Sequence, residues 1–126
     1  MHIPLPLDIL LVEDNELHRE LIVRMLDLVG YSADVVTNGT EALQAVEKKE
    51  YELIFMDLAM PLLDGFETTR TIRSHNAMQD TYIIAVTALS SPKEKCRSAG
   101  IDDILQKPIL LDDFRAALAR FHSTHN

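Results

Sequence analysis

Five side chains that could act together each follow a short apolar run in this sequence. The acids Glu13 and Asp14 follow one run, Asp57 ends another, and Thr87 and Lys107 follow two more. Carboxylates that lie close together repel, so one of them takes up a proton unless a cation lies among them. Mg²⁺ suits this set, because it binds through few carboxylates and keeps several waters for a phosphate.

This set of residue types predicts phosphoryl transfer. With Mg²⁺ held by Asp14 and Asp57, a free oxygen of Asp57 can attack phosphorus as a nucleophile. The transferring group spreads its charge over three oxygens, and each needs a partner. Mg²⁺ can pair with one oxygen and Lys107 with another, and the Thr87 hydroxyl and the Ala88 amide can pair with the third.

The apolar runs indicate strands, which must bring these residues together. Unbroken apolar runs this short, ended by polar residues or turn signals, are typical of strands buried on both faces. We predict strands at 9–12, 33–36, 53–56 and 82–86, and a weaker one at 103–106. Helical patterns lie between them, so we expect one α/β domain with a parallel sheet covered on both faces. Ligands bind such sheets outside the carboxyl ends of the strands, where the predicted site residues converge.

The helices are predicted from apolar periodicity and from start and stop signals. The first runs over 15–29, where Gly30 stops it, and the second follows Asn38 and Gly39. The third starts at Gly65, after Asp64 as a cap, and runs to about 76. The fourth starts at Ser91-Pro92 and ends at Gly100, and the last covers 112–121.

The first helix has more apolar surface than one face of a sheet needs. We interpret this surface as core, and a face that docks a partner is the alternative, with Leu17 and Leu21 as its candidates. The apolar residues at helical spacing are Leu17, Leu21, Ile22, Met25, Leu26, Leu28 and Val29.

Composition limits the classes of protein. The chain has 126 residues, 47% of them hydrophobic, which suits a single domain over 1–126 with its core at about 7–121 and loose ends at 1–6 and 123–126. A net charge of −8 argues against nucleic acid and anionic membranes as direct partners. The one cysteine, Cys96, and the absence of a leader or a membrane-spanning run lead us to expect a soluble, cytoplasmic protein.

Five ordered motifs resemble the receiver domain of two-component response regulators. They are VEDN at 12–15, FMDLAMP at 55–61, DG at 64–65, VTA at 86–88 and GIDDILQKPI at 100–109. The resemblance covers about 7–121 and is most like the receivers of hybrid histidine kinases. It implies a flavodoxin-like, doubly wound parallel sheet of five strands in the order 2-1-3-4-5 with helices on both faces.

The resemblance also implies roles for the site residues. Asp57 would accept a phosphoryl group from the phosphohistidine of a histidine kinase, and the Thr87 side chain would turn toward that group. Lys107 would pair with the phosphoryl group and be joined to Pro108 by a cis peptide bond. The Mg²⁺ ligands would be Asp14, Asp57 and the backbone carbonyl of Ala59, with Glu13 acting through water.

Ile104 departs from the family pattern. Receivers usually carry Tyr or Phe at this switch position, three residues before the lysine, and isoleucine is stiff and has no ring or hydroxyl. Phosphoryl transfer does not need the ring, whereas signalling through the last strand does. We therefore expect a relay, in which Asp57 passes its phosphoryl group to a histidine phosphotransfer partner. Any further output must come from another polypeptide or from a larger protein that includes this chain.

Two other functions are weighed against the receiver. A phosphohydrolase of the haloacid dehalogenase type also uses an aspartyl nucleophile, but it needs an acid two residues later, where this chain has Ala59. A receiver-like interaction module that is never phosphorylated is the second alternative. The histidines His18, His75, His122 and His125 are interpreted as solvated or frayed.

Overall fold

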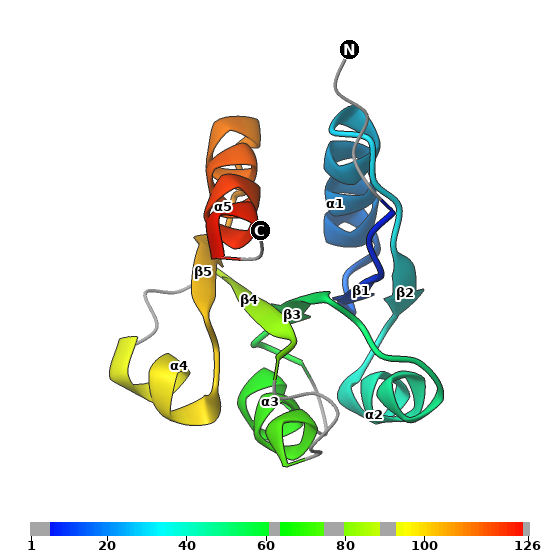
Figure 1. The fold of residues 1–126 in the computed structure, drawn as a ribbon, viewed down its shortest axis with the longest axis vertical. Coiled ribbons are helices and arrows are strands. Elements are labelled where there is room, and N and C mark those ends of the chain that lie inside the picture. Colours follow the sequence, from blue (N-terminus) through cyan, green and yellow to red (C-terminus); the bar gives the residue numbers. More distant parts are fainter. Residues whose placement is uncertain (1–5, 61–63, 75–79, 89–92, 125–126) are drawn as a thin grey trace.

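A parallel sheet of five strands lies at the centre of the computed structural model, which describes residues 6–60, 64–74, 80–88 and 93–124 (Figure 1). Strands and helices alternate along the chain, as predicted. In order they are β1 (Ile9–Val12), α1 (Glu16–Leu28), β2 (Asp34–Val36), α2 (Gly39–Lys48), β3 (Leu53–Asp57), α3 (Gly65–Arg73), β4 (Tyr82–Thr87), α4 (Lys93–Ala99), β5 (Asp103–Gln106) and α5 (Leu111–Thr124).

The strand order is β2-β1-β3-β4-β5, and all four pairings are parallel. This confirms the predicted doubly wound topology. In the register, Val12 pairs with Met56 and Asp57 pairs with Val86. The carboxyl ends of the neighbouring strands therefore lie side by side at one edge of the sheet.

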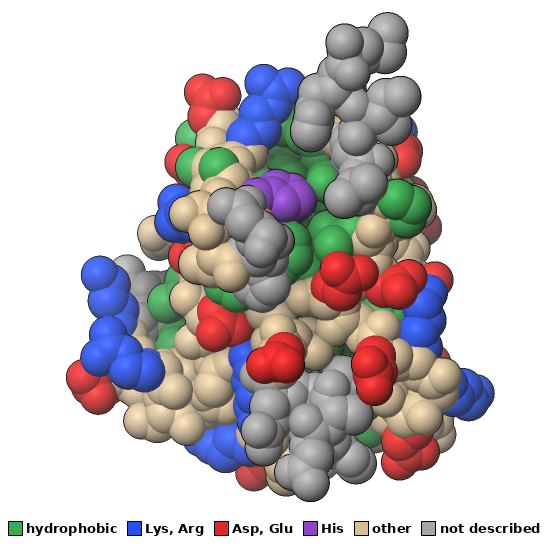
Figure 2. Space-filling model, in the orientation of Figure 1, with side chains coloured by type: hydrophobic (Ala, Val, Ile, Leu, Met, Phe, Trp, Pro, Cys, Tyr) green, Lys and Arg blue, Asp and Glu red, His purple; other side chains and the backbone are tan. Residues whose placement is uncertain are grey.

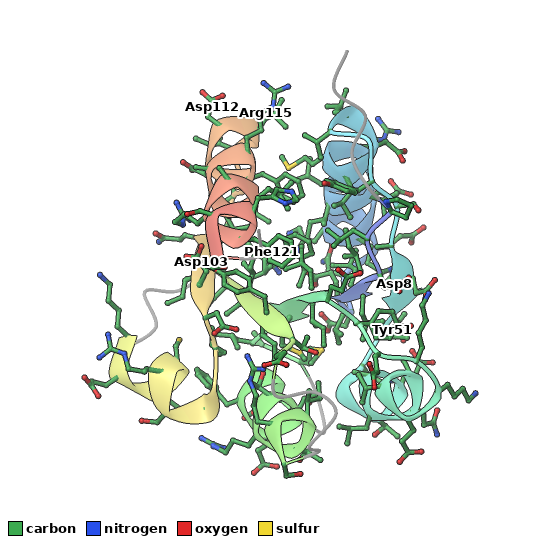
Figure 3. All side chains as sticks on the ribbon, in the orientation of Figure 1. Asp8, Tyr51, Asp103, Asp112, Arg115 and Phe121 are labelled. Atoms are coloured by element: carbon green, nitrogen blue, oxygen red, sulfur yellow. The ribbon has the colours of Figure 1, made fainter. Side chains whose placement is uncertain are left out.

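The helices cover the sheet on both faces, with α1 and α5 on one face and α2, α3 and α4 on the other (Figure 1). Strand side chains alternate between the faces. Ile9 and Leu11 of β1 join the core cluster on the α1 and α5 side, and Leu10 and Val12 join the other cluster. Side chains fill both layers, and Phe121 of α5 lies between the helix and the sheet (Figure 3), where its ring contacts that of Tyr82 on β4. This double burial explains why β1, β3 and β4 are almost entirely apolar.

Three helices begin at side-chain caps. Asn15, Asn38 and Asp64 each accept a hydrogen bond from the backbone N–H three residues later, which satisfies one of the free donors of the first turn. The role of Asp64 as a cap is therefore confirmed. The start of α4 that we predicted at Ser91-Pro92 lies outside the described residues.

Two predicted boundaries were wrong. Helix α3 ends at Arg73 with Ser74 as its C-cap, before the predicted end near 76. Helix α5 continues to Thr124, so residues 123 and 124 are helical instead of forming a loose end. The hydroxyl of Thr124 donates to the Phe121 carbonyl at 2.9 Å, and Phe121 is buried against the sheet. The added residues are exposed, so this hydrogen bond, and not burial, holds the helix beyond its apolar stripe.

Arg73 connects the end of α3 to two other segments, the residue before β4 and the connection between α4 and β5. Its guanidinium donates to the Gly100 carbonyl at 2.9 Å, to the Thr81 carbonyl, and to Asp102 Oδ2 at 2.7 Å. Asp102 Oδ2 also accepts from the N–H of Ile83 at 2.8 Å. This network holds the starts of β4 and β5 in place at the edge opposite the predicted site.

The charged residues are dispersed over the surface. In the view of Figure 2, both acidic and basic side chains are scattered over the face. Helix α4 carries three basic residues, Lys93, Lys95 and Arg97. Among the described residues, no helix has the length and apolar character needed to cross a bilayer.

Candidate functional site

The predicted site residues meet at the carboxyl edge of the sheet. Glu13 and Asp14 directly follow β1, Asp57 is the last residue of β3, and Thr87 is the last of β4. Carboxylate oxygens of Glu13, Asp14 and Asp57 all lie within 4.8 Å of one another. The Nζ atom of Lys107, just beyond β5, lies 3.0 Å from Glu13 Oε1 and 3.7 Å from Asp57 Oδ1.

Hydrogen bonds from the backbone and from Arg19 fix the turn that carries the first two acids. The N–H of Glu13 donates to the Val36 carbonyl at 3.1 Å, which extends the pairing of β1 with β2. The Arg19 guanidinium, one helical turn into α1, donates to the carbonyls of Glu13 at 3.1 Å and Asp14 at 2.9 Å. The N–H of Asn15 donates to Glu13 Oε2 at 3.2 Å. The acids are therefore held by the same turn that starts α1.

Gly65 determines how closely α3 approaches the end of β3. A Cβ atom at this position would lie 2.3 Å from the Asp57 carbonyl oxygen and 2.8 Å from the Leu58 Cα atom. Only glycine therefore fits against this backbone. The N–H of Ala59 donates to Asp57 Oδ1 at 3.1 Å, so the loop after β3 also orients the carboxylate.

The site concentrates negative charge away from water. Glu13 is fully buried and Asp57 is only 2% exposed, whereas Asp14 is exposed. Burial, followed by the hydrogen bond and the charge of Glu13, raises the pKa of the Asp57 carboxyl from 3.8 to about 8, although the Ala59 N–H opposes this shift. The shift has the direction expected for clustered carboxylates without a cation.

The donor set fits a hard divalent ion. Glu13 Oε1 is buried and has no aligned hydrogen bond among the described residues, and its ion pair with Lys107 compensates its charge. Two further carboxylates lie within reach, one of them exposed to solvent. Mg²⁺ prefers oxygen ligands and retains water, and a half-open cluster of three acids offers both.

Thr87 and Lys107 are linked through the backbone. The N–H of Lys107 donates to the Thr87 carbonyl at 2.7 Å, which continues the pairing of β4 with β5. Thr87 is 5% exposed and Ala88 is exposed. The peptide bond between Lys107 and Pro108 is cis, which confirms that prediction. The partners of Thr87 and Ala88 on a phosphoryl group stay predictions.

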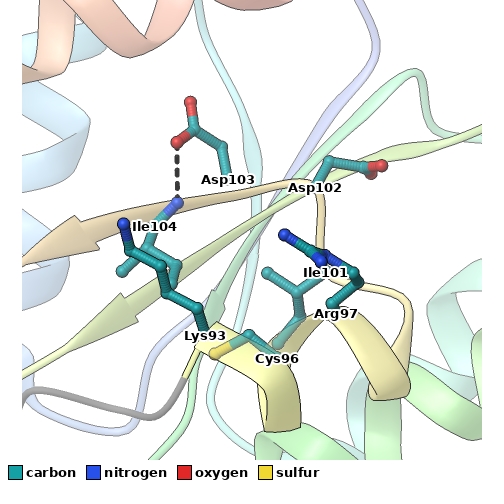
Figure 4. Close-up of a pocket in the computed structure, with 7 residues that line it drawn as sticks. All are labelled: Lys93, Cys96, Arg97, Ile101, Asp102, Asp103 and Ile104. Carbon is teal, nitrogen blue, oxygen red and sulfur yellow. Dashed lines mark hydrogen bonds between the residues drawn. The ribbon is translucent and has the colours of Figure 1, made fainter.

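Ile104 lies on β5, half-buried beside a cavity of about 370 Å³ between β5 and α4 (Figure 4). It packs against the core cluster beneath α2, α3 and α4, and its N–H donates to Asp103 Oδ1 at 2.8 Å. The side chains that line this cavity are Lys93, Cys96, Arg97, Ile101, Asp102, Asp103 and Ile104.

The apolar surface of α1 divides into two parts. Ile22, Met25 and Leu26 are buried in the core, as predicted. Leu17 is 74% exposed and Leu28 is 68% exposed, so their interpretation as core was wrong. The apolar surface of the helix is wider than its contact with the sheet, because only one stripe faces β1 and β3.

His18 is the residue of the site that the sequence analysis missed. Its Nδ1 atom lies 2.9 Å from Lys107 Nζ and 3.9 Å from Glu13 Oε2. The His18 side chain is 43% exposed, so the prediction of a solvated side chain holds in part, but the contact with Lys107 was not predicted. His75 and His125 lie outside the described residues. The place of His18 in the first turn after β1, four residues after Asp14, could have indicated this contact.

Comparisons with known proteins agree on one family. The family model for the response regulator receiver domain matches residues 9–119. The sensor protein EvgS of Escherichia coli is 36% identical over 120 residues, which cover 95% of this chain and 10% of that protein. Hybrid signal transduction histidine kinase B of Dictyostelium discoideum is 40% identical over 127 residues, which cover 90% of this chain and 6% of that protein. The chain thus spans about a tenth or less of these relatives.

Solved structures share the fold over almost the whole chain. The chemotaxis protein CheY4 of Vibrio cholerae has a TM-score of 0.87 at 27% identity, with 93% of this chain and 99% of that chain covered. The receiver domain of the sensor histidine kinase PA1611 of Pseudomonas aeruginosa has a TM-score of 0.84 at 37% identity, and the match covers 93% of this chain and 98% of that chain. That structure has a magnesium ion coordinated in its active-site cleft.

Proposed function

The chain belongs to the response regulator receiver domain family, and we propose that it accepts a phosphoryl group on Asp57 from the phosphohistidine of a histidine kinase. The observation that carries this proposal is the cluster of Glu13, Asp14 and Asp57 within 4.8 Å, with Lys107 beside it. In the reaction, the phosphorus–nitrogen bond of the donor breaks as a bond forms between phosphorus and an Asp57 oxygen. The electron pair of the broken bond stays on the imidazole nitrogen that leaves.

Each residue of the site has a role in this proposal. Asp57 is the nucleophile, and its carboxylate is oriented by the Ala59 N–H. The Lys107 ammonium pairs with one phosphoryl oxygen, and the Thr87 hydroxyl and the Ala88 amide pair with another. These roles follow from the position of each residue at the end of a strand.

Mg²⁺ would be held by Asp14, Asp57 and the Ala59 carbonyl, with Glu13 acting through water. When bound, it supplies positive charge that lets Asp57 ionise and that neutralises a phosphoryl oxygen. This ligand set is supported by the raised pKa of Asp57 and by the buried Glu13 Oε1, which lacks an aligned donor among the described residues.

Intact mass after incubation with acetyl phosphate tests the proposal. We expect the wild type to gain one phosphoryl group with Mg²⁺ and none in its absence, and Asp57→Asn to gain none. Asp64→Asn is the matched control, because the change is the same but Asp64 only caps α3. A folded wild type that gains no adduct would instead favour the interaction module that is never phosphorylated.

We further propose that Asp57 passes the phosphoryl group to a histidine on a helical phosphotransfer partner. Leu17 and Leu21 of α1 are 74% and 39% exposed, and Leu110 before α5 is 62% exposed. Leu21 also lines a cavity of about 70 Å³ together with His18, Lys107, Pro108 and Ile109. An apolar helix could bury this surface while its histidine reaches Asp57. The absence of a ring at Ile104 favours such a relay over signalling through β5.

Leu17→Lys and Leu21→Lys test the docking surface. We expect both to slow transfer to or from a histidine partner and to leave phosphorylation by acetyl phosphate unchanged, since a small donor needs no docking. Leu28→Lys is the control, because Leu28 is 68% exposed but lies at the other end of α1. Transfer at the wild-type rate in both variants would refute docking on α1.

The larger context of the chain is also a proposal. We propose that 1–126 acts as one receiver domain in the cytoplasm, with a histidine kinase as donor and no direct contact with nucleic acid or membrane. The net charge of −8 supports this set of partners.

A further inference from the structure

Among the described residues, three polar side chains lie near the Lys107 ammonium. Glu13 Oε1 lies 3.0 Å away and Asp57 Oδ1 lies 3.7 Å away, and both interact as ion pairs. Among the described residues, only His18 Nδ1, at 2.9 Å, has the geometry of a hydrogen bond to Nζ. The Lys107 side chain is 13% exposed, so little water competes for its protons.

The chemistry of the two groups defines the direction of this bond. An ammonium group only donates, so His18 Nδ1 accepts and the ring hydrogen is on Nε2. The His18 backbone is held in the first turn of α1, where its N–H donates to Asn15 Oδ1 at 3.0 Å. The backbone that carries the acceptor for Lys107 is therefore held by a capped helix.

We propose that His18 is a positioning residue for phosphoryl transfer, because its Nδ1 atom holds the Lys107 ammonium between Glu13 and Asp57. The proposal rests on the proposed function of Asp57 as phosphoacceptor. One N–H of the ammonium is used by His18, and the distance of 3.7 Å to Asp57 Oδ1 leaves another N–H available for a phosphoryl oxygen. Without the acceptor on α1, the ammonium is free to move onto the carboxylates and loses this orientation.

Two substitutions separate the acceptor from the bulk of the ring. His18→Leu removes the acceptor. His18→Asn retains an acceptor in a similar place, because the amide oxygen of asparagine is bonded to Cγ, as Nδ1 is in histidine. We expect His18→Leu to lower the rate constant of phosphorylation by acetyl phosphate about fivefold and His18→Asn to stay within about twofold of the wild type. Glu20→Gln, an exposed change in the same helix, is the control.

Mg²⁺ affinity and the melting temperature are measured for every variant. Positioning of Lys107 predicts that the rate constant falls in His18→Leu while the Kd for Mg²⁺ and the Tm stay near wild-type values. A rate unchanged in His18→Leu, or equal losses in His18→Leu and His18→Asn, would overturn the proposal. If the wild type itself gains no phosphoryl group, the proposed role of Asp57 as phosphoacceptor is wrong. That result differs from a normal wild type with an unchanged His18→Leu rate, which would contradict only the role of His18.

Discussion

Replacement of Asp57 by asparagine is expected to stabilise the metal-free protein at neutral pH. Asp57 is 2% exposed and lies among two other carboxylates, so its ionised form is disfavoured in the folded state. Its pKa is raised from 3.8 to about 8, first by burial and then by Glu13. The amide introduced by Asp57→Asn carries no charge and can still accept from the Ala59 N–H, which donates to Asp57 Oδ1 at 3.1 Å.

The magnitude follows from linkage between protonation and folding. A raised pKa means that the contribution of Asp57 to stability is fully present below its ordinary pKa and is lost as the pH rises from about 4 to about 8. One pKa unit corresponds to about 1.4 kcal/mol, so the full shift would cost roughly 4 kcal/mol at pH 7. Lys107 Nζ, 3.7 Å from Asp57 Oδ1, favours the ionised form and offsets part of this cost. We therefore expect Asp57→Asn to raise the free energy of unfolding by about 2 kcal/mol at pH 7.

Urea unfolding in EDTA at several pH values between about 5 and 8 measures this difference. The gain from Asp57→Asn should grow with pH, and added Mg²⁺ should reduce it, because the ion binds the folded wild type and stabilises it. Asp64→Asn should stay within about 0.5 kcal/mol of the wild type, since aspartate and asparagine cap helices equally well. The reasoning is refuted if Asp57→Asn in EDTA is no more stable than the wild type at pH 7 or if its gain does not change with pH.

Three other changes have expected outcomes in the same assay. Gly65→Ala should cost about 2–3 kcal/mol and slow phosphorylation, since its Cβ would lie 2.3 Å from the Asp57 carbonyl oxygen; wild-type stability would contradict the tight packing. Arg73→Met should cost about 2–3 kcal/mol, because it leaves Asp102 without its 2.7 Å ion pair and two carbonyls without their donor; the Kd for Mg²⁺ should not change. Phe114→Leu should cost about 1–2 kcal/mol through loss of its stacking on Phe55 at 5.4 Å, and a loss below about 0.5 kcal/mol would contradict that contact.

Local sequence was sufficient for the strands, the parallel sheet and the acidic cluster, whereas the strand order was predicted from the family resemblance. Strands buried on both faces must be apolar throughout, so β1, β3 and β4 are visible as runs that end at Glu13, Asp57 and Thr87. The carboxyl ends of parallel strands meet at one edge, so residues at those ends must be neighbours once the topology is known. Helix starts were also predictable, because caps such as Asn15 and Asp64 act within one turn.

Helix ends and side-chain contacts depended on the tertiary structure. The last turn of α5 is exposed, and it is held by the hydrogen bond from the Thr124 hydroxyl to the Phe121 carbonyl and by the contact of His122 with the Tyr31 hydroxyl, which periodicity along the chain does not report. Leu17 and Ile22 are both apolar residues of α1, yet one is 74% exposed and the other fully buried, because only one stripe of the helix faces the sheet.

The sequence by itself determined which residue types stand at the ends of the strands, and therefore the chemistry that this edge of the sheet can support. Only the tertiary structure decided that His18 contacts Lys107, since the two residues are 89 positions apart and lie on different elements. It also decided that Glu13 is fully buried while its neighbour Asp14 is exposed. The physical reason is that a pattern along the chain reports which face of an element is apolar, whereas contacts between elements depend on how these faces pack in three dimensions.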